Sequence, residues 1–265
     1  MKTRKKTVWL TLVLSLLLAL TACTPITSEE SDGTAAGDGT ATETAPPKLV
    51  MATDPTFPPY EYNGDQGIAG IDIDIANKIA AKLGLELEIK TIPFNDIVAA
   101  VQNKQVDIGM AALTADETRL AVVNFTSPYA TGKQMIIVNK DSDITAPAGL
   151  AGKRIGVQQN TAGSTYCTEE FGTAAVQSFG TGAEALQALL QGSVDAVVID
   201  DGPAKMLAQT SQSVVILDTE YKLDKYAIAV NKDSSSLLKK INSALAELKA
   251  SGEIQSIIDS YIKAE

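Results

Sequence analysis

The sequence contains no histidine, and it has only two cysteines and one tryptophan. Without histidine, Ser-His-Asp and Cys-His catalysis, histidine general bases and histidine metal ligands are all excluded. The two cysteines, Cys23 and Cys167, cannot build a four-cysteine zinc site and define no disulfide framework. We therefore expect a protein without catalytic residues of these types, without a metal site and without a cofactor.

Positive charge is also scarce. The chain has 22 Lys and Arg residues against 32 Asp and Glu residues, a formal net charge of −10, and four of the basic residues (Lys2, Arg4, Lys5 and Lys6) lie in the first six positions. A nucleic-acid-binding face or a surface that docks on anionic lipid needs a basic patch, so both functions are excluded. The 265 residues, 45% of them hydrophobic, suffice for one large or two small domains with cores of their own.

The longest hydrophobic run, residues 8–20, follows the basic residues at the N-terminus. It is shorter than the about 20 residues that a membrane-spanning helix needs, and it fits the hydrophobic region of a secretory signal. The run leads into Leu20-Thr21-Ala22-Cys23, which resembles the bacterial lipobox, whose cysteine becomes the acylated first residue of the mature protein. We expect a signal peptide over 1–22 and lipidation of Cys23; the alternative is an ordinary signal peptide with an incidental cysteine.

Residues 23–47 are rich in Thr, Ser, Ala, Gly, Pro and acidic residues and contain a single isoleucine. Such a segment cannot bury enough apolar surface to offset the entropy of ordering it. We expect it to be a flexible linker that follows the lipidated cysteine. Cys167 then has no partner within the chain, and we expect it to be a small, half-buried side chain.

From Lys48 onward the hydrophobic pattern alternates between strand and helix periods, which is typical of α/β folds with mainly parallel sheets. Gly84 directly after the first helical pattern is a C-cap signal. The expected strands are 49–53, 85–89, 106–112, 134–138, 154–158, 196–199, 214–217 and 226–230, and the expected helices include 72–83, 95–103, 235–250 and 253–262.

An internal similarity predicts two related lobes. Residues 94–110 align with 182–198 at an offset of 88, and both stretches read as a helix, a tight polar turn and a strand. In open α/β sheets, ligands bind beyond the carboxyl ends of the strands. Those ends are Ala112–Thr114 in the first half and Asp200-Asp201 in the second, and we expect the two edges to face each other across a cleft.

Side chains at these strand ends and in the loops after them combine a fixed cation, hydroxyl groups, carboxylates and aromatic rings. The guanidinium of Arg119 matches a carboxylate because its planar fork can donate two parallel hydrogen bonds. A carboxylate such as that of Asp200 matches an ammonium group. A cleft that offers both is complementary to the zwitterion of an α-amino acid, with the aromatic rings covering its carbon stem.

The order and spacing of several segments resemble the family 3 extracellular solute-binding proteins of bacteria, the polar amino-acid receptors of ABC importers. The resemblance runs from about Leu49 to Ile262 and rests on TDPTFPPYEY with GIDIDIANKIA, TRLAVVNFTSPY, GKRIGV, VDAVVIDDGPA and YAIAV. It implies a two-lobed fold like that of the type II periplasmic binding proteins, with lobe 1 formed by 48–138 and 228–265 and lobe 2 by 139–227. The two hinge crossings are then expected near 138–144 and 226–228.

The resemblance also assigns ligand-binding positions. It implies that Arg119 holds the α-carboxylate, that Asp200 takes the α-ammonium, and that Asp54, pointing into the cleft, meets nitrogen on the ligand side chain. The other implied positions are Phe57 and Phe94 as apolar walls, Thr114 as a hydroxyl, and Ala112, Thr161 and Ala162 in loops that bond the ligand; Gln158 is placed to reach a polar side chain. Asn160 and Ala112 depart from the family pattern, which usually has glycine and a hydroxyl residue there.

We therefore expect an extracytoplasmic receptor, anchored by lipid at the cell surface or in the periplasm, that is not an enzyme. It would act as a monomer that captures a polar or basic L-amino acid by hinge closure and delivers it to a membrane permease. One alternative is an enzyme on the same fold, a cyclohexadienyl dehydratase-like protein in which a pocket carboxylate such as Asp54 serves as general acid. Another is a sensor module that acts as a soluble partner.

Overall fold

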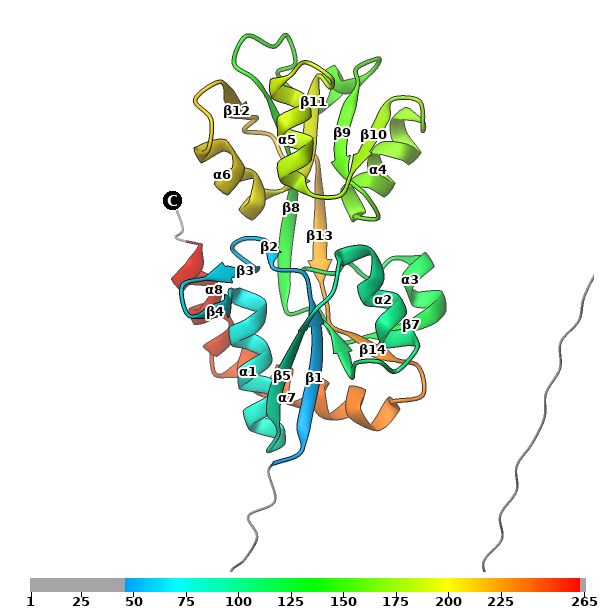
Figure 1. Ribbon diagram of the computed structural model, residues 1–265, viewed down its shortest axis with the longest axis vertical. Helices are drawn as coiled ribbons and strands as arrows, with labels where there is room; N and C mark the ends of the chain where they lie inside the picture. Colours follow the sequence, from blue (N-terminus) through cyan, green and yellow to red (C-terminus); the bar gives the residue numbers. More distant parts are fainter. Residues whose placement is uncertain (1–45, 263–265) are drawn as a thin grey trace, which may run out of the picture. The chain divides into compact units, whose positions relative to one another are not determined.

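The computed structural model describes residues 46–262, so the expected signal peptide, Cys23 and nearly all of the expected linker lie outside the described residues. Two sheets with helices on both faces form two lobes, and the strands β8 (Ala130–Asn139) and β13 (Lys222–Tyr226) run between them (Figure 1). The chain thus has the α/β, two-lobed architecture expected for a type II binding protein. None of the helices in this range is long and apolar enough to cross a membrane.

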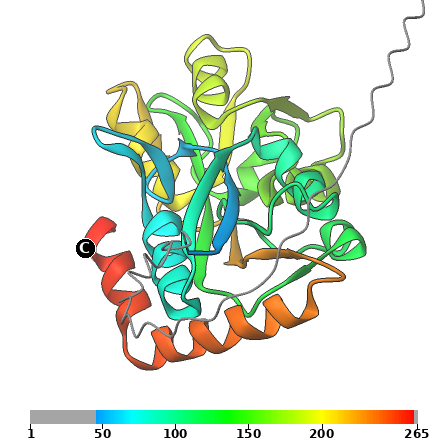
Figure 2. The ribbon, with the colours of Figure 1, turned by 60° about the horizontal axis from the view of Figure 1, so that its bottom comes forward.

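The first lobe is built on a five-stranded mixed sheet in the order β5-β1-β6-β14-β7. Its strands are β1 (Lys48–Thr53), β5 (Glu86–Thr91), β6 (Ile108–Gly109), β7 (Val123–Phe125) and β14 (Ala229–Asn231). Side chains alternate between its faces: Leu49 and Met51 of β1 pack with α1 (Ile71–Leu83), whereas Ala52 packs with α2 (Phe94–Gln102). The terminal helices α7 (Ser235–Ala250) and α8 (Glu253–Tyr261) lie beside α1 (Figure 2).

The second lobe is built on a six-stranded mixed sheet in the order β10-β9-β11-β8-β12, with β13 also paired to β8. The remaining strands are β9 (Ile155–Gln158), β10 (Val176–Phe179), β11 (Ala196–Asp200) and β12 (Val214–Ile216), and the short helix η1 (Pro147–Leu150) precedes β9. Alternate residues again face opposite cores. Val198 packs on the side of α4 (Ala162–Phe171), and Val197 packs against α5 (Gly182–Leu190) and α6 (Asp201–Gln209).

The internal similarity holds in three dimensions. Helices α2 and α5 have the same length and start at the expected offset of 88. Asp107, just before β6, accepts a hydrogen bond at Oδ2 from the backbone N–H of Val50, and Asp195, just before β11, accepts one from that of Arg154, both at 2.8 Å. Each aspartate therefore links a helix–strand turn to the neighbouring strand, which brings corresponding strand ends to the same edge of each sheet.

Three local features differ from the sequence-based expectation. The strand expected over 226–230 is divided between the two sheets, because β13 pairs with β8 while β14 pairs with β6 and β7. The strand expected over 106–112 is reduced to Ile108–Gly109, and the chain then turns at Ala112, where φ is +46°. The pattern also gave no sign of the small sheet β2 (Thr56–Phe57), β3 (Glu61–Gly64) and β4 (Gly67–Ala69).

Strand β8 corrects the position of the first hinge crossing. Its residues Ala130–Gln134 pair with β13, and Gln134–Val138 pair with β11. By 138–144, where the crossing was expected, the chain is already inside the second sheet. The crossing is instead the antiparallel ribbon formed by the start of β8 and β13, and Tyr226 at its end bridges to Thr114 of the first lobe.

Candidate functional site

Residues from both lobes surround one small cavity. Nine of the expected ligand-binding residues line it, together with Ala111: Phe57, Phe94, Ala112, Thr114, Arg119, Gln158, Thr161, Ala162 and Asp200. They lie at strand ends, in the loops that follow or in the first turn of the next helix. Asp54 is not among the lining residues.

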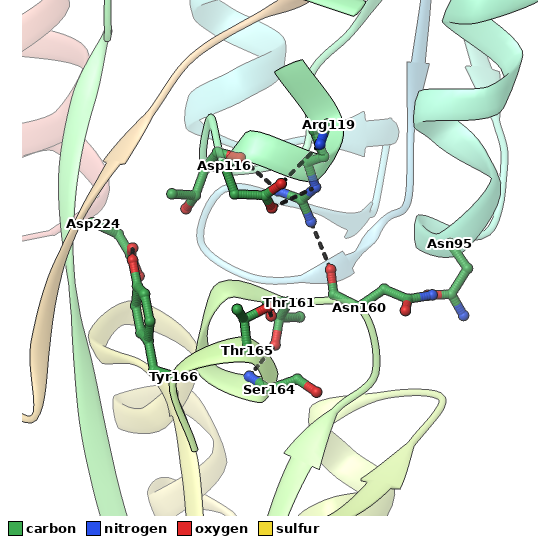
Figure 3. Close-up of polar contacts among 10 residues, drawn as sticks. Asn95, Asp116, Arg119, Asn160, Thr161, Ser164, Thr165, Tyr166 and Asp224 are labelled. Carbon is green, nitrogen blue, oxygen red and sulfur yellow. Dashed lines mark hydrogen bonds and ion pairs between the residues drawn. The ribbon is translucent and has the colours of Figure 1, made fainter. Parts of the chain in front are cut away.

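Arg119, in the short helix α3 (Glu117–Val122), is the cation of this site and is 8% exposed. Its Nη1 donates to the carbonyl oxygen of Thr114 at 2.8 Å, and its Nη2 crosses to the second lobe and donates to that of Asn160 at 2.6 Å (Figure 3). Asp116 lies 3.5 Å from Nε, and the guanidinium lies 5.5 Å from the centre of the Phe94 ring. Burial lowers the pKa of this guanidinium, while the nearby Asp116 opposes that shift.

The second lobe presents the N-terminus of α4 to the cavity. Thr161 is the N-cap: its Oγ1 accepts a hydrogen bond from the backbone N–H of Ser164 at 3.2 Å and donates to the carbonyl oxygen of Gln158 at 2.8 Å. Asn160, just before it, has φ of +57°, a conformation that asparagine tolerates. The first turn of a helix carries unpaired N–H groups and a partial positive charge, so Thr161 and Ala162 add a second group that suits an anion.

Asp200 supplies a carboxylate at the end of β11 and is 6% exposed. The hydroxyl of Tyr226 donates a hydrogen bond to its Oδ1. Burial raises the pKa of Asp200 to about 7, and the neighbouring Asp224 adds to that rise, whereas Tyr226 and Gln134 reduce it. A cationic group beside Asp200 would favour its charged form.

A buried polar network lies behind this wall of the cavity. Asp224 of β13 accepts a hydrogen bond from Nε2 of Gln134 at 2.7 Å. It accepts a second one from the hydroxyl of Tyr166, also at 2.7 Å (Figure 3). Gly163 of α4 lies so close to Gln134 that a Cβ there would be 2.6 Å from its Oε1. The network therefore joins the hinge ribbon to the helix whose N-terminus faces the cavity. Sequence reasoning did not single out Asp224, because a lone acid between lysines resembles an ordinary exposed strand residue.

The lobes also touch beside the cavity. Nδ2 of Asn160 donates to Oδ1 of Asn95, in α2, at 2.8 Å. Phe57 packs against core residues of both lobes, and Gly202 of α6 leaves room for Pro59, whose Cδ would lie 2.7 Å from a Cβ at that glycine. These contacts hold the two cavity walls together on more than one side.

Asp54 has a different contact from the one expected. Its Oδ2 accepts a hydrogen bond from the backbone N–H of Phe94 at 2.9 Å, at the start of α2. The N–H groups of the first turn have no partner within a helix, and the N-cap position here is Pro93, which offers no capping side chain. The half-buried Asp54 carboxylate fills that role, so it orients Phe94, one wall of the cavity; its contact with a ligand stays a prediction.

Taken together, these groups can hold a small zwitterion. A guanidinium, a helix N-terminus and a carboxylate line the same cavity, and Phe57 and Phe94 provide apolar walls. Within residues 46–262, no group of three His, Cys, Asp or Glu side chains could hold a metal ion. The arrangement suits selective binding through charge and hydrogen bonds.

Comparison with known proteins identifies a family. A sequence model of the bacterial extracellular solute-binding proteins, family 3, matches residues 49–264. The arginine-binding extracellular protein of Bacillus subtilis (strain 168) is 30% identical over 97% of this chain and 98% of its own length. The L-cystine-binding protein of Escherichia coli (strain K12) is 24% identical over 82% of this chain and 83% of its own.

Solved structures give the same result. The arginine-, lysine-, histidine-binding protein of Geobacillus stearothermophilus superposes with a TM-score of 0.76 at 30% identity, covering 82% of this chain and 96% of its own. An ancestral arginine-binding protein bound to glutamine superposes with a TM-score of 0.75 at 35% identity, covering 82% and 98%. The names of these relatives describe binding proteins.

Proposed function

The chain belongs to the bacterial extracellular solute-binding proteins of family 3, and on that premise we propose that it binds a polar or basic L-amino acid between its lobes. The observation that carries the proposal is the cavity itself. Arg119 from the first lobe lines it, together with the N-terminus of α4 and Asp200 from the second lobe. These charged groups match the α-carboxylate and the α-ammonium of an amino acid, and both ligand charges would be desolvated on binding.

The charges around the cavity favour a neutral or cationic ligand side chain. Asp200, Asp224 and Asp116 all act electrostatically on Arg119, so several carboxylates surround a single guanidinium. A ligand carboxylate on the side chain would meet like charges in a desolvated site, which is strongly unfavourable. The names of relatives that refer to arginine, to lysine and histidine, or to bound glutamine support this range. We keep arginine, lysine and glutamine as equal candidates.

The wider role follows from family membership and from the N-terminal sequence. We infer that Cys23 carries a lipid anchor, that residues 24–47 link it to the lobes, and that the closed, ligand-bound form delivers its amino acid to an ABC permease. This proposal keeps the expected two lobes (48–138 with 228–265, and 139–227) but moves the first boundary to the β8–β13 ribbon, so that Gln134–Val138 belong to lobe 2. The protein would act as a monomer outside the cytoplasm.

A screen of ligand-stripped protein, residues 24–265, against the twenty amino acids tests the proposal. At a hundredfold excess over Kd, binding adds roughly 2.7 kcal/mol to the free energy of unfolding, which is a clear shift in melting temperature. We expect shifts with one or more of arginine, lysine and glutamine, and none with aspartate or glutamate. No shift with any amino acid, or a shift with glutamate alone, would overturn the proposal. Incubation with a prephenate-like acid, followed by mass spectrometry, tests the enzyme alternative.

A further inference from the structure

Two acidic side chains are buried directly behind the first-lobe wall of the cavity. Glu61 of β3 is 1% exposed, and Asp72, in the first turn of α1, is 0% exposed. When both groups are treated as acceptors, the two carboxylate oxygens of Glu61 have no hydrogen-bonding partner. Oδ1 of Asp72 has none either. Two charged carboxylates with unpartnered oxygens in a dry interior would be very costly, because burial penalises charge and like charges repel.

A single proton removes this conflict. A proton on Glu61 turns its carboxyl group into a donor, and Asp72 then accepts from it. Burial and, as the next largest cause, the charge of Asp72 hold the pKa of Glu61 well above its usual range. Burial also raises the pKa of Asp72, to about 6, but the hydrogen bond from the Ala112 N–H, and the neighbouring Tyr129 and Glu61, oppose that rise. Asp72 is thus the member of the pair that keeps the charge.

Asp72 is joined to the site through Ala112. The backbone N–H of Ala112 donates to Oδ2 of Asp72 at 2.9 Å. Ala112 has φ of +46°, in the left-handed region that alanine rarely adopts, and such a conformation persists only when surrounding contacts enforce it. Ala111, Ala112 and Thr114 line the cavity, so the bond to Asp72 holds the turn that forms this wall.

We propose that Glu61 and Asp72 share one proton and that the resulting Asp72 carboxylate is a positioning residue, which holds Ala112 and the adjoining cavity wall ready for the ligand. The part that concerns the ligand rests on the proposed function; the shared proton does not. Neither Glu61 nor Asp72 lines the cavity, and the bond to Ala112 is the contact that joins Asp72 to its wall.

Other titratable groups face the pair from every neighbouring element. Tyr129, before β8, lies beside Asp72, and Tyr60, before β3, is affected by both acids. The charges of Asp54 and Asp200 also act on Glu61. Burial raises the pKa of both tyrosines, so their hydroxyl groups stay protonated and neutral across the neutral range. Among the described residues, the largest influences on the two acids are burial, other acids and hydrogen bonds, which makes the proton the neutralising charge.

Glu61→Gln is the informative variant, because the glutamine amide replaces the shared proton with a permanent donor of the same size. In the folded wild type Glu61 keeps its proton, whereas in the unfolded chain Glu61 loses it above an ordinary pKa of about 4.3. The free energy of unfolding of the wild type therefore falls, relative to that of Glu61→Gln, as pH rises. Urea unfolding of both proteins from about pH 5 to pH 8 should show a steadily widening difference in favour of the variant. A flat difference would overturn the shared proton.

The positioning role is tested by binding and by the Ala112 amide. Asp72→Asn removes the charge that Ala112 donates to, and we expect at least tenfold weaker binding of the amino acid found in the screen, in line with the loss of a charged hydrogen bond. Glu61→Gln should bind within about twofold of wild type. The matched control is Asp74→Asn, two residues along the same helical turn, whose Oδ2 accepts from the Tyr261 hydroxyl at 2.8 Å away from the cavity; it too should bind within about twofold.

The amide resonance of Ala112, in ¹⁵N-labelled protein without ligand, separates this proposal from the proposed function. A carboxylate acceptor moves an amide proton downfield, so the resonance should shift upfield in Asp72→Asn and stay in place in Glu61→Gln. An unmoved Ala112 resonance in Asp72→Asn, or binding by Asp72→Asn as tight as by Asp74→Asn, would contradict the positioning role. If the wild type binds no amino acid, the proposed function fails, while the Ala112 resonance and the unfolding difference still decide the shared proton.

Discussion

Arg119 shows how one side chain can be held ready for a ligand. Its guanidinium is oriented by two backbone carbonyl groups, one from each lobe, and by the ring of Phe94. The sequence indicated this residue because an arginine five positions after Thr114 fits the family pattern. It did not reveal that Arg119 also bridges the lobes, because the position of Asn160 depends on how the second sheet is placed.

We expect Arg119→Ala to weaken amino-acid binding by two to four orders of magnitude, which corresponds to roughly 3–5 kcal/mol for an uncompensated buried charge. Arg119→Lys should also bind poorly, because a point charge cannot replace the fork of donors. Calorimetry on ligand-stripped protein measures both. Near wild-type affinity for Arg119→Ala would rule out its contact with the carboxylate.

The raised pKa of Asp200 predicts a pH-dependent affinity. With a pKa of about 7, Asp200 is largely protonated below that pH, and it must lose the proton to pair with an ammonium group. Affinity should therefore fall by up to about tenfold for each pH unit below 7, with a proton released on binding. Calorimetry in buffers of different ionisation enthalpy detects that proton. Asp200→Asn should bind weakly and without this dependence; a wild-type affinity that is unchanged from pH 7 to pH 5 would contradict the assignment.

At the scale of elements, the sequence predicted most of the fold because hydrophobic periodicity reports which face of a helix or strand is buried. The repeat of α2 and α5 and the C-cap at Gly84 were readable in this way. The division of the strand expected over 226–230 between two sheets was not readable, because its two halves are equally apolar. Only their pairing with strands far away in the chain shows that they belong to different sheets. The bond between Asp54 and Phe94 was not readable for a similar reason: it depends on where α2 begins.

The loop before α4 gives a prediction at this scale. The side chain of Asn160 bonds Asn95 across the lobes, whereas its carbonyl oxygen accepts from Arg119. Asn160→Gly keeps the left-handed backbone and the carbonyl and removes only the side-chain bridge. We expect a two- to fivefold faster dissociation of the ligand and an unchanged association rate, in line with one exposed hydrogen bond.

A double-mutant cycle with Asn95→Ala supplies the control. If the two side chains act together, the double variant should dissociate no faster than either single variant. Effects that simply multiply would show that the Asn95–Asn160 contact does not slow release of the ligand.

On the scale of the whole molecule, the hinge ribbon and the contacts around the cavity predict closure on the ligand. The ribbon of β8 and β13 is narrow, and the lobes otherwise meet at polar contacts such as Asn95–Asn160 and at the packing of Phe57 and Pro59. We expect a smaller radius of gyration by small-angle X-ray scattering with saturating ligand than in stripped protein. An unchanged radius would indicate a rigid pocket.

The prediction for the N-terminus is independent of the lobes. Cys23→Ala should give soluble, unacylated protein with normal amino-acid binding, because the anchor and the cavity are separate parts of the chain. Fractionation of cells and mass spectrometry of the mature N-terminus provide the measurement. Persistent membrane association of the variant would contradict lipid anchoring through Cys23.

The central claim is that the cavity recognises both charges of an amino-acid zwitterion, and analogues that lack one charge test it most directly. For the amino acid selected by the screen, calorimetry would compare the parent with its decarboxylated amine (agmatine for arginine, cadaverine for lysine) and with the acid that lacks the α-amino group. We expect both analogues to bind at least about a hundredfold more weakly, because each leaves Arg119 or Asp200 without its partner. An analogue that binds as tightly as the parent amino acid would contradict the account.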